Sequence, residues 1–240
     1  MRRRGTISAA AIAVAVYATW RSGLLTRLRH AAIPGIADRA WAIPGLPAMM
    51  ARTWNRRVKV FESYDVQPGD VVMLGDSITE GAAWSALFPG ARIHNEGIGG
   101  DDTEGVLRRL ALVTNRRPGK VFLMIGTNDL GKGIRSPDEI VHNIATIVDR
   151  IRADSPTTAI YLQSVLPRIR RRADQVREVN GGIERIAHDR GATWIDLRPI
   201  FDRGDGAMDL SLAPDALHPN ADGNRRWAEF LAPFVTDTGA

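Results

Sequence analysis

The 240-residue sequence contains no cysteine, which excludes disulfide bonds, thiolate nucleophiles and thiolate metal ligands together. Aromatic residues make up only 6% of the chain, and it has no basic stripe interleaved with aromatic side chains, the pattern typical of nucleic-acid binding. The formal net charge of +5 comes from basic residues that are almost all arginine and are scattered along the chain. We therefore expect no nucleic-acid partner and a fold held together by packing alone.

The N-terminus carries a basic segment followed by an apolar one. Three arginines at positions 2–4 precede an alanine- and valine-rich run over residues 7–20, the order found in secretory signals. The run is shorter than the roughly 20 residues that span a bilayer. We interpret residues 1–30 as a signal-like or membrane-anchor segment, which predicts an exported or membrane-anchored protein. The alternative is an amphipathic helix lying on the domain of a cytoplasmic protein.

Residues 31–54 read as a linker or arm that leads into a helix. Pro34-Gly35 and Pro44-Gly45 mark turns and would break a continuing helix. A lead-in helix is expected over residues 48–63, and residues 55–240 are expected to form one domain.

Strands and helices then alternate along the chain. Strands are expected at 71–75, 91–95, 120–126, 158–165 and 193–197, and helices at 80–88, 103–115, 137–153, 173–190 and 221–234. Residues 121–125 are apolar throughout, as in strands buried on both faces. Ser136 and Glu139 predict a capping box at the start of the third helix. The pattern is that of an α/β fold with a doubly wound parallel sheet.

Four polar segments follow strands of this sheet. They are Ser77, residues 95–101, residues 126–129 and residues 215–218. Ligands of open parallel sheets bind outside the carboxyl ends of the strands, so we expect all four segments at one edge of the sheet.

The residue types in these segments suit nucleophilic catalysis. Ser77 would be the nucleophile and His218 its base, with the Asp215 carboxylate orienting the imidazole. The oxyanion of a tetrahedral intermediate needs hydrogen-bond donors. The candidates are the backbone N–H groups of Ser77 and Gly100 and the side-chain amide of Asn128.

Together these motifs resemble the four blocks of the SGNH (GDSL-type) hydrolases. The matching segments are Gly75-Asp76-Ser77, Gly97-Ile98-Gly99-Gly100, Gly126-Thr127-Asn128-Asp129 and Asp215-Ala216-Leu217-His218-Pro219. The resemblance is closest to the branch with the platelet-activating-factor acetylhydrolase subunits and lysophospholipase-like esterases. It implies a flavodoxin-like three-layer α/β/α fold with a five-stranded parallel sheet of order 2-1-3-4-5. It also implies a triad of Ser77, Asp215 and His218, and an oxyanion hole of Ser77, Gly100 and Asn128.

Other interpretations of single motifs are weaker. The glycines at 97, 99 and 100 are not followed by a lysine at P-loop spacing, and Asp215 with His218 would be too few ligands for a metal. We expect no metal and no cofactor. Asp76 is interpreted as structural. Trp84 is interpreted as a core residue, and the basic run 168–172 as a solvated helix start rather than a phosphate-binding rim.

The predicted function is that of a serine esterase acting on carboxylic esters through an acyl-enzyme. A short acyl group is favoured, as in O-acetyl or lysophospholipid-type substrates, and the substrate could be a small molecule, a lipid or a glycan. The alternatives are an acyltransferase or cell-envelope polysaccharide O-acetylesterase with the same triad, and a non-catalytic binding domain. The oligomeric state is not predicted.

Overall fold

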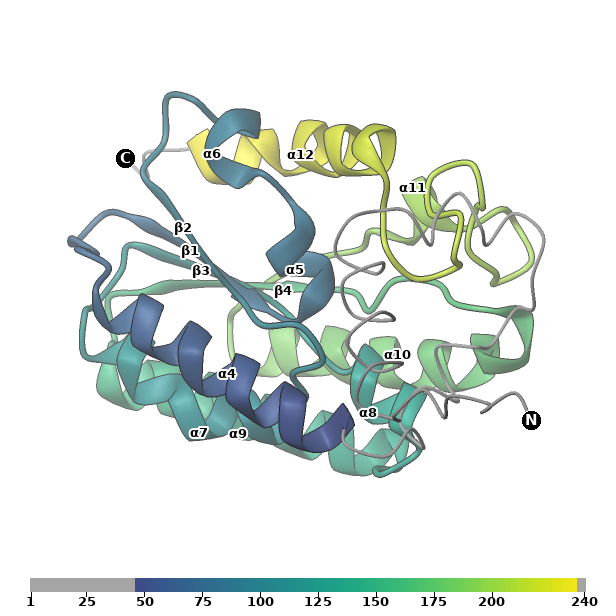
Figure 1. The fold of residues 1–240 in the computed structure, drawn as a ribbon, viewed down its shortest axis with the longest axis horizontal. Coiled ribbons are helices and arrows are strands. Elements are labelled where there is room, and N and C mark those ends of the chain that lie inside the picture. Colours follow the sequence, from purple (N-terminus) through teal and green to yellow (C-terminus); the bar gives the residue numbers. More distant parts are fainter. Residues whose placement is uncertain (1–45, 237–240) are drawn as a thin grey trace, which may run out of the picture.

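The computed structural model describes residues 46–236, which form a parallel five-stranded sheet between two layers of helices (Figure 1). The strands are β1 (Val71–Gly75), β2 (Ile93–Gly97), β3 (Lys120–Met124), β4 (Ala159–Gln163) and β5 (Thr193–Ile195). Their order is β2-β1-β3-β4-β5, and every neighbouring pair is parallel. The predicted fold class and strand order are confirmed.

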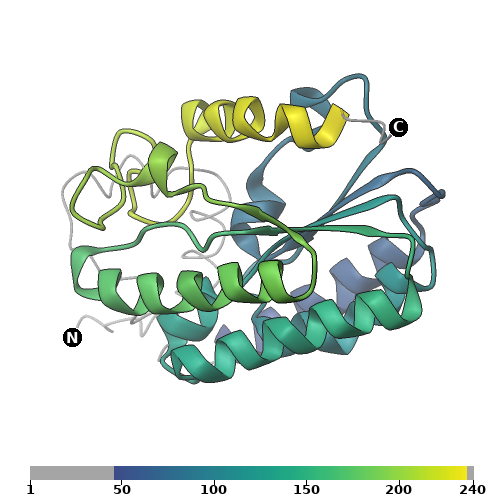
Figure 2. The ribbon, with the colours of Figure 1, turned by 180° about the vertical axis from the view of Figure 1, so that it is seen from behind.

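Helices cover both faces of the sheet. In chain order they are α4 (Leu46–Glu62), α5 (Ser77–Gly81), α6 (Trp84–Leu87), α7 (Thr103–Thr114), α8 (Thr127–Lys132), α9 (Pro137–Asp154), α10 (Ala173–Asp189), α11 (Arg198–Phe201) and α12 (Ala221–Thr236). The layer with α4, α7, α9 and α10 lies below the sheet in Figure 1, and α6 and α12 lie above it; Figure 2 shows the same layers from behind.

Two hydrophobic cores fill the space between the sheet and these layers. Side chains alternate along a strand. Val72 and Leu74 therefore pack in the core between the sheet and α7, α9 and α10, whereas Val71 and Met73 pack in the core between the sheet and α12. The second core holds Trp84, only 2% exposed, whose Nε1 donates to the Thr79 carbonyl at 2.9 Å. The interpretation of Trp84 as a core residue is confirmed.

The prediction of one helix over 80–88 is wrong, because two short helices, α5 and α6, take its place. The Asn95 amide donates to the carbonyls of Glu80 and Ala82, both at 3.1 Å, where α5 ends. A side chain from β2 thus takes the acceptors that a continuing helix would use. By contrast, α9 carries the predicted capping box between Ser136 and Glu139.

Of the N-terminal segments predicted from the sequence, the structure describes only the lead-in helix, α4. Residues 1–45 lie outside the described residues, and with them the signal-like segment 1–30 and most of the arm. α4 runs without a break across the expected boundary between residues 54 and 55. None of the helices within 46–236 is long and apolar enough to cross a membrane.

Candidate active site

Ser77 is the first residue of α5, directly after β1 and the turn at Gly75-Asp76. The Asp76 side chain accepts from the Ile78 N–H at 2.9 Å and caps the short helix. A side chain at position 75 could not fit, since a Cβ there would lie 2.5 Å from the Met124 carbonyl oxygen. The turn therefore holds Ser77 in one place at the carboxyl end of β1.

Asp215 and His218 are joined within one loop before α12. The Asp215 Oδ2 lies 2.7 Å from the His218 Nδ1, and its Oδ1 accepts from the backbone N–H groups of Leu217 and His218. Between them Ala216 has a φ of +60°, in the left-handed region that residues with a Cβ rarely adopt. This tight turn brings the carboxylate within hydrogen-bond distance of the His218 Nδ1.

The other imidazole nitrogen meets the serine. His218 Nε2 lies 3.0 Å from Ser77 Oγ, although the two residues are 141 positions apart in the sequence. A neutral imidazole in this place can accept the hydroxyl proton, and a carboxylate on Nδ1 stabilises the resulting imidazolium. The structure thus brings together the three residues that the sequence analysis selected.

The candidate oxyanion donors come from two further segments, the loop after β2 and the start of α8. Gly100 has a φ of +76°, which a residue without a Cβ tolerates, and Asn128 is the second residue of α8. The Asn128 amide donates to the Asp101 carbonyl at 2.8 Å. Because an amide has two N–H donors, this bond orients the group and leaves the second donor for another acceptor.

Asp101 ties these loops to the serine turn. Its carboxylate accepts from Arg109 Nε at 2.9 Å, and Arg109 also donates to the Gly75 carbonyl at 3.0 Å. Both side chains are almost completely buried. The sequence analysis missed this pair. The available signal was an arginine on the apolar face of α7, which also carries Val106, Leu110 and Val113.

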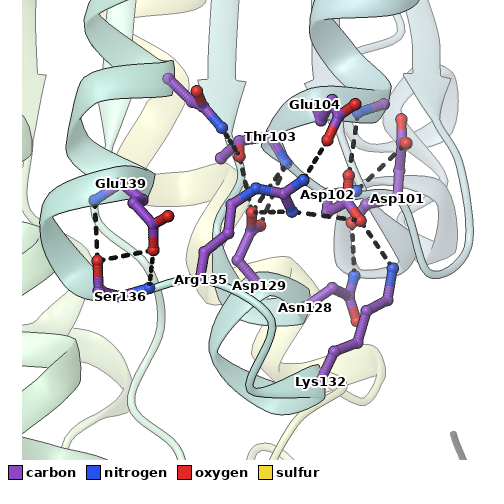
Figure 3. Close-up of polar contacts among 12 residues, drawn as sticks. Asp101, Asp102, Thr103, Glu104, Asn128, Asp129, Lys132, Arg135, Ser136 and Glu139 are labelled. Atoms are coloured by element: carbon purple, nitrogen blue, oxygen red, sulfur yellow. Dashed lines mark hydrogen bonds and ion pairs between the residues drawn. The ribbon is translucent and has the colours of Figure 1, made fainter.

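A second buried polar cluster lies next to Asn128 (Figure 3). The Asp129 carboxylate accepts from the Thr103 hydroxyl at 2.7 Å and pairs with Arg135 at 3.1 Å. Lys132 bridges the Gly100 carbonyl and the Asp102 carboxylate, both at 2.9 Å. Burial raises the pKa of Asp129. The cluster joins the loops of Gly100 and Asn128 into one support.

Asp76, the residue before Ser77, is buried. Burial, together with the Asp101 and Asp129 carboxylates, raises the pKa of Asp76 to about 7. Its side chain caps α5 through the Ile78 N–H, in agreement with the structural interpretation made from the sequence.

The basic run 168–172 divides in two. Arg170, Arg171 and Arg172 form a 3-10 helix before α10, as expected for a helix start. Arg168 differs from the expectation of a solvated side chain, because it is only 5% exposed and donates to the Thr127 carbonyl at 2.8 Å. It thereby holds Thr127, the residue next to Asn128.

His94 has an acid partner that sequence spacing did not indicate. Its Nε2 lies 2.8 Å from Asp70 Oδ2, and Asp70 also pairs with Arg92 at 2.8 Å. Asp70 precedes β1, whereas Ser77 follows it, so this pair lies at the other end of the strand. Within residues 46–236, no three His, Asp or Glu side chains are grouped as ligands for a metal ion.

A flavodoxin-like sheet with a serine, a histidine and an aspartate at its carboxyl edge defines the class of α/β serine hydrolases. The sequence model of the GDSL-like lipase/acylhydrolase family matches residues 73–226, and the chain belongs to this family.

Known proteins agree with this placement. The human platelet-activating factor acetylhydrolase IB subunit alpha1 is 30% identical over 171 residues, which cover 66% of this chain and 71% of that protein. A GDSL-like lipase from Bacteroides thetaiotaomicron has a TM-score of 0.66 at 23% identity, over 76% of this chain and 96% of its own. A mutant of Axe2, an acetylxylan esterase from Geobacillus stearothermophilus, has a TM-score of 0.59 at 19% identity. The match covers 72% of this chain and 97% of that protein. The family and its esterase members make this protein a carboxylic ester hydrolase.

Proposed function

We propose that the protein is a serine esterase in which Ser77, His218 and Asp215 form the catalytic triad. The observation that carries the proposal is the continuous chain of contacts from Ser77 Oγ to His218 Nε2 at 3.0 Å and from His218 Nδ1 to Asp215 Oδ2 at 2.7 Å. Gly100 and Asn128 would complete the oxyanion hole together with the Ser77 N–H.

The proposed reaction has two steps. Ser77 Oγ attacks the ester carbonyl while its proton passes to His218 Nε2, and His218 then gives that proton to the leaving alcohol. The acyl group remains on Ser77. In the second step His218 takes a proton from water, the hydroxide attacks the acyl-enzyme, and the proton returns to Ser77 Oγ as the acid leaves.

The oxyanion donors would supply much of the rate. Negative charge develops on the carbonyl oxygen in both steps, and fixed donors in a partly buried site stabilise it without reorganising. The Asn128 amide is fixed by Asp101, and Asp101 by Arg109, so little motion is left in the donor.

Acetyl is the first acyl group to test. A human relative is named an acetylhydrolase, and a structural neighbour is named an acetylxylan esterase, which supports an acetyl ester of a lipid or glycan alcohol as the smallest substrate. The signal-like residues 1–30 support export or membrane anchoring, which fractionation of cells producing the full chain would test.

The decisive comparison is between the full-length chain and its Ser77→Ala variant on p-nitrophenyl acetate. We expect the variant to lose at least about 10³-fold in kcat, because the nucleophile is gone while the fold is unchanged. A fluorophosphonate probe should label only the unmodified protein. Equal activity of the two proteins would refute the mechanism. Faster transfer of the acetyl group to an added alcohol than to water would instead make the protein an acyltransferase.

A further inference from the structure

The loop that carries Gly100, a candidate oxyanion donor, is not packed on every side. Residues 99–102 border a cavity of about 540 Å³, which Met50, Ala51 and Trp54 of α4 also line. A donor stabilises an oxyanion without reorganising only if it is already fixed before the reaction. Hydrogen bonds to the backbone of this loop are therefore needed to keep Gly100 in position.

The amide groups on both sides of Gly100 have acceptors, whereas the Gly100 amide does not. Ile98 N donates to the last carbonyl of β1 at 3.1 Å, and Asp101 N donates to the Ile98 carbonyl at 3.0 Å. Between them, Gly99 N donates to a carboxylate oxygen of Glu80 at 2.7 Å. In the part of the chain that the structure describes, no acceptor binds the Gly100 N–H. The loop thus leaves one N–H for a ligand and binds its neighbours.

Glu80 contacts this loop in two places. Its carboxylate binds Gly99 N, and its backbone lies directly against Gly97, where a Cβ would come within 2.2 Å of Glu80 N. A hydrogen bond from an N–H to a carboxylate is shorter and stronger than one between neutral groups. Because Ser77 and Glu80 both belong to α5, the bond ties the loop to the helix that carries the candidate nucleophile.

Arg57 of α4 binds both Glu80 and the loop. Its Nε lies 3.3 Å from Glu80 Oε1, while Gly99 N uses Oε2, and its Nη2 donates to the Gly97 carbonyl at 3.1 Å. The guanidinium lies 4.8 Å from the ring centre of the buried Phe61. The two charged side chains are only 22% and 27% exposed, so salt screens this ion pair less than a surface pair.

We infer that Glu80 is a positioning residue for the oxyanion donor Gly100, and that Arg57 fixes Glu80 in that role. The inference rests on the proposed esterase function and deepens it. Two glycines in succession have wide conformational freedom, and the bond from Gly99 N to Glu80 restricts it next to the donor. Without the carboxylate, the loop loses its side-chain bond to α5, and the Gly100 N–H is held less firmly relative to Ser77. Arg57 lies before residue 73, where the match to the family model begins.

The test measures hydrolysis of p-nitrophenyl acetate by the full-length protein and by its variants Glu80→Ala, Glu80→Gln, Arg57→Ala and Ser77→Ala. Glu80→Ala should lower kcat by about 10- to 100-fold and leave KM within about threefold, since removing an oxyanion donor costs on the order of 10²–10³-fold and displacing one costs less. Glu80→Gln keeps an acceptor for Gly99 N and should recover kcat to within about fivefold of the unmodified protein.

The contribution of Arg57 has a matched control on the same helix. Arg57→Ala should lower kcat by about threefold to tenfold, because Glu80 and the Gly97 carbonyl lose their shared partner. Arg56 is the preceding residue and is exposed, so Arg56→Ala should leave kcat unchanged. Equal kcat values in the two variants would remove the role assigned to Arg57.

Two further measurements separate positioning from a loss of folded protein. Titration with a fluorophosphonate counts the reactive Ser77 sites, and we expect the same count in Glu80→Ala as in the unmodified protein, with slower labelling. Phenylboronic acid forms a tetrahedral adduct with a reactive serine and so resembles the transition state. Its inhibition constant should therefore rise in Glu80→Ala by about as much as kcat/KM falls.

Three results would overturn the inference. They are an unchanged kcat in Glu80→Ala, a loss that only follows the number of titratable sites, and equal losses in Glu80→Ala and Glu80→Gln. In each case the unmodified protein would still hydrolyse the ester and Ser77→Ala would not, so the proposed function would stand. Absence of Ser77-dependent hydrolysis in the unmodified protein would instead remove the proposed function, and the inference with it.

Discussion

Each end of β1 has a histidine in contact with an aspartate, yet the two ends differ in chemistry. At the carboxyl end, His218 lies between Asp215 and the hydroxyl of Ser77. At the amino end, His94 contacts Asp70, whose other side-chain partner is Arg92. The contact distances are nearly the same, 2.7 and 2.8 Å. A histidine–aspartate contact is therefore no evidence of catalysis until the second nitrogen of the ring faces a nucleophile.

The aspartates that flank β1 show the same contrast. Burial alone would raise the pKa of Asp70, but hydrogen bonds, the largest from Arg92, lower it to about 2. Burial raises the pKa of Asp76 to about 7, and its side chain accepts a hydrogen bond from the backbone N–H of Ile78. Asp70 has a direct ion pair with Arg92, whereas Asp76 lies near two further carboxylates, Asp101 and Asp129, as well as the Arg168 guanidinium. A charged aspartate is therefore disfavoured at position 76, next to the candidate nucleophile, and favoured at position 70.

The largest expected difference between the two ends is in catalysis. Asp215→Asn should lower kcat by about 10⁴-fold, because the amide stabilises neither the correct tautomer of His218 nor the imidazolium. The matched control Asp70→Asn should leave kcat within about twofold and lower the free energy of unfolding by about 1 to 3 kcal/mol, since the buried Asp70 carboxylate is a charged acceptor for several donors. Steady-state kinetics and urea unfolding measure the two effects. A large loss of kcat in Asp70→Asn would abolish the distinction.

A smaller effect is expected in the pH dependence of stability. Because the folded-state pKa of Asp76 is raised above its unfolded value, its contribution to stability is fully present below about pH 4 and is lost as the pH rises through about 7. Asp76→Asn keeps a capping oxygen but does not ionise. Relative to this variant, the unmodified protein should lose roughly 1 to 3 kcal/mol between pH 5 and pH 8. The same difference in unfolding free energy between the two proteins at pH 5 and at pH 8 would contradict the raised pKa.

The smallest expected effect concerns the turn at Ala216. A left-handed backbone costs a residue with a Cβ about 1 to 2 kcal/mol, and glycine avoids this cost but loses about 0.5 to 1 kcal/mol in chain entropy. Ala216→Gly should therefore raise stability by up to about 1 kcal/mol and leave kcat within a fewfold. Thermal unfolding and ester hydrolysis provide the readouts. A clear loss of stability would mean that the φ of +60° carries no strain.

Much of the fold was predictable because local signals agreed with one another. The apolar segment at 71–75 coincides with β1, and the capping residues Ser136 and Glu139 place the start of α9 correctly. The errors lie where a partner from elsewhere decides the boundary. Asn95, which belongs to β2, binds the carbonyls at the end of α5. Arg168 is buried, and Thr127 provides acceptors for its guanidinium.

The candidate site was predictable for a related reason. Ser77, Gly100, Asn128, Asp215 and His218 each follow a strand or precede a helix, and a parallel sheet gathers such positions at one edge. The supporting residues were not predictable. Arg109 lies within a helix and interacts with a carboxylate eight positions away and a carbonyl 34 positions away.

The sequence by itself determined the sheet, its edge and the residue types that meet there, because hydrophobic periodicity and turn residues act over a few positions. Only the tertiary structure decided which of two histidine–aspartate contacts faces a serine, which arginines are buried, and that α4 lines a pocket beside Gly100. These outcomes depend on contacts between distant segments, and burial turns such contacts into strong constraints on charge and orientation.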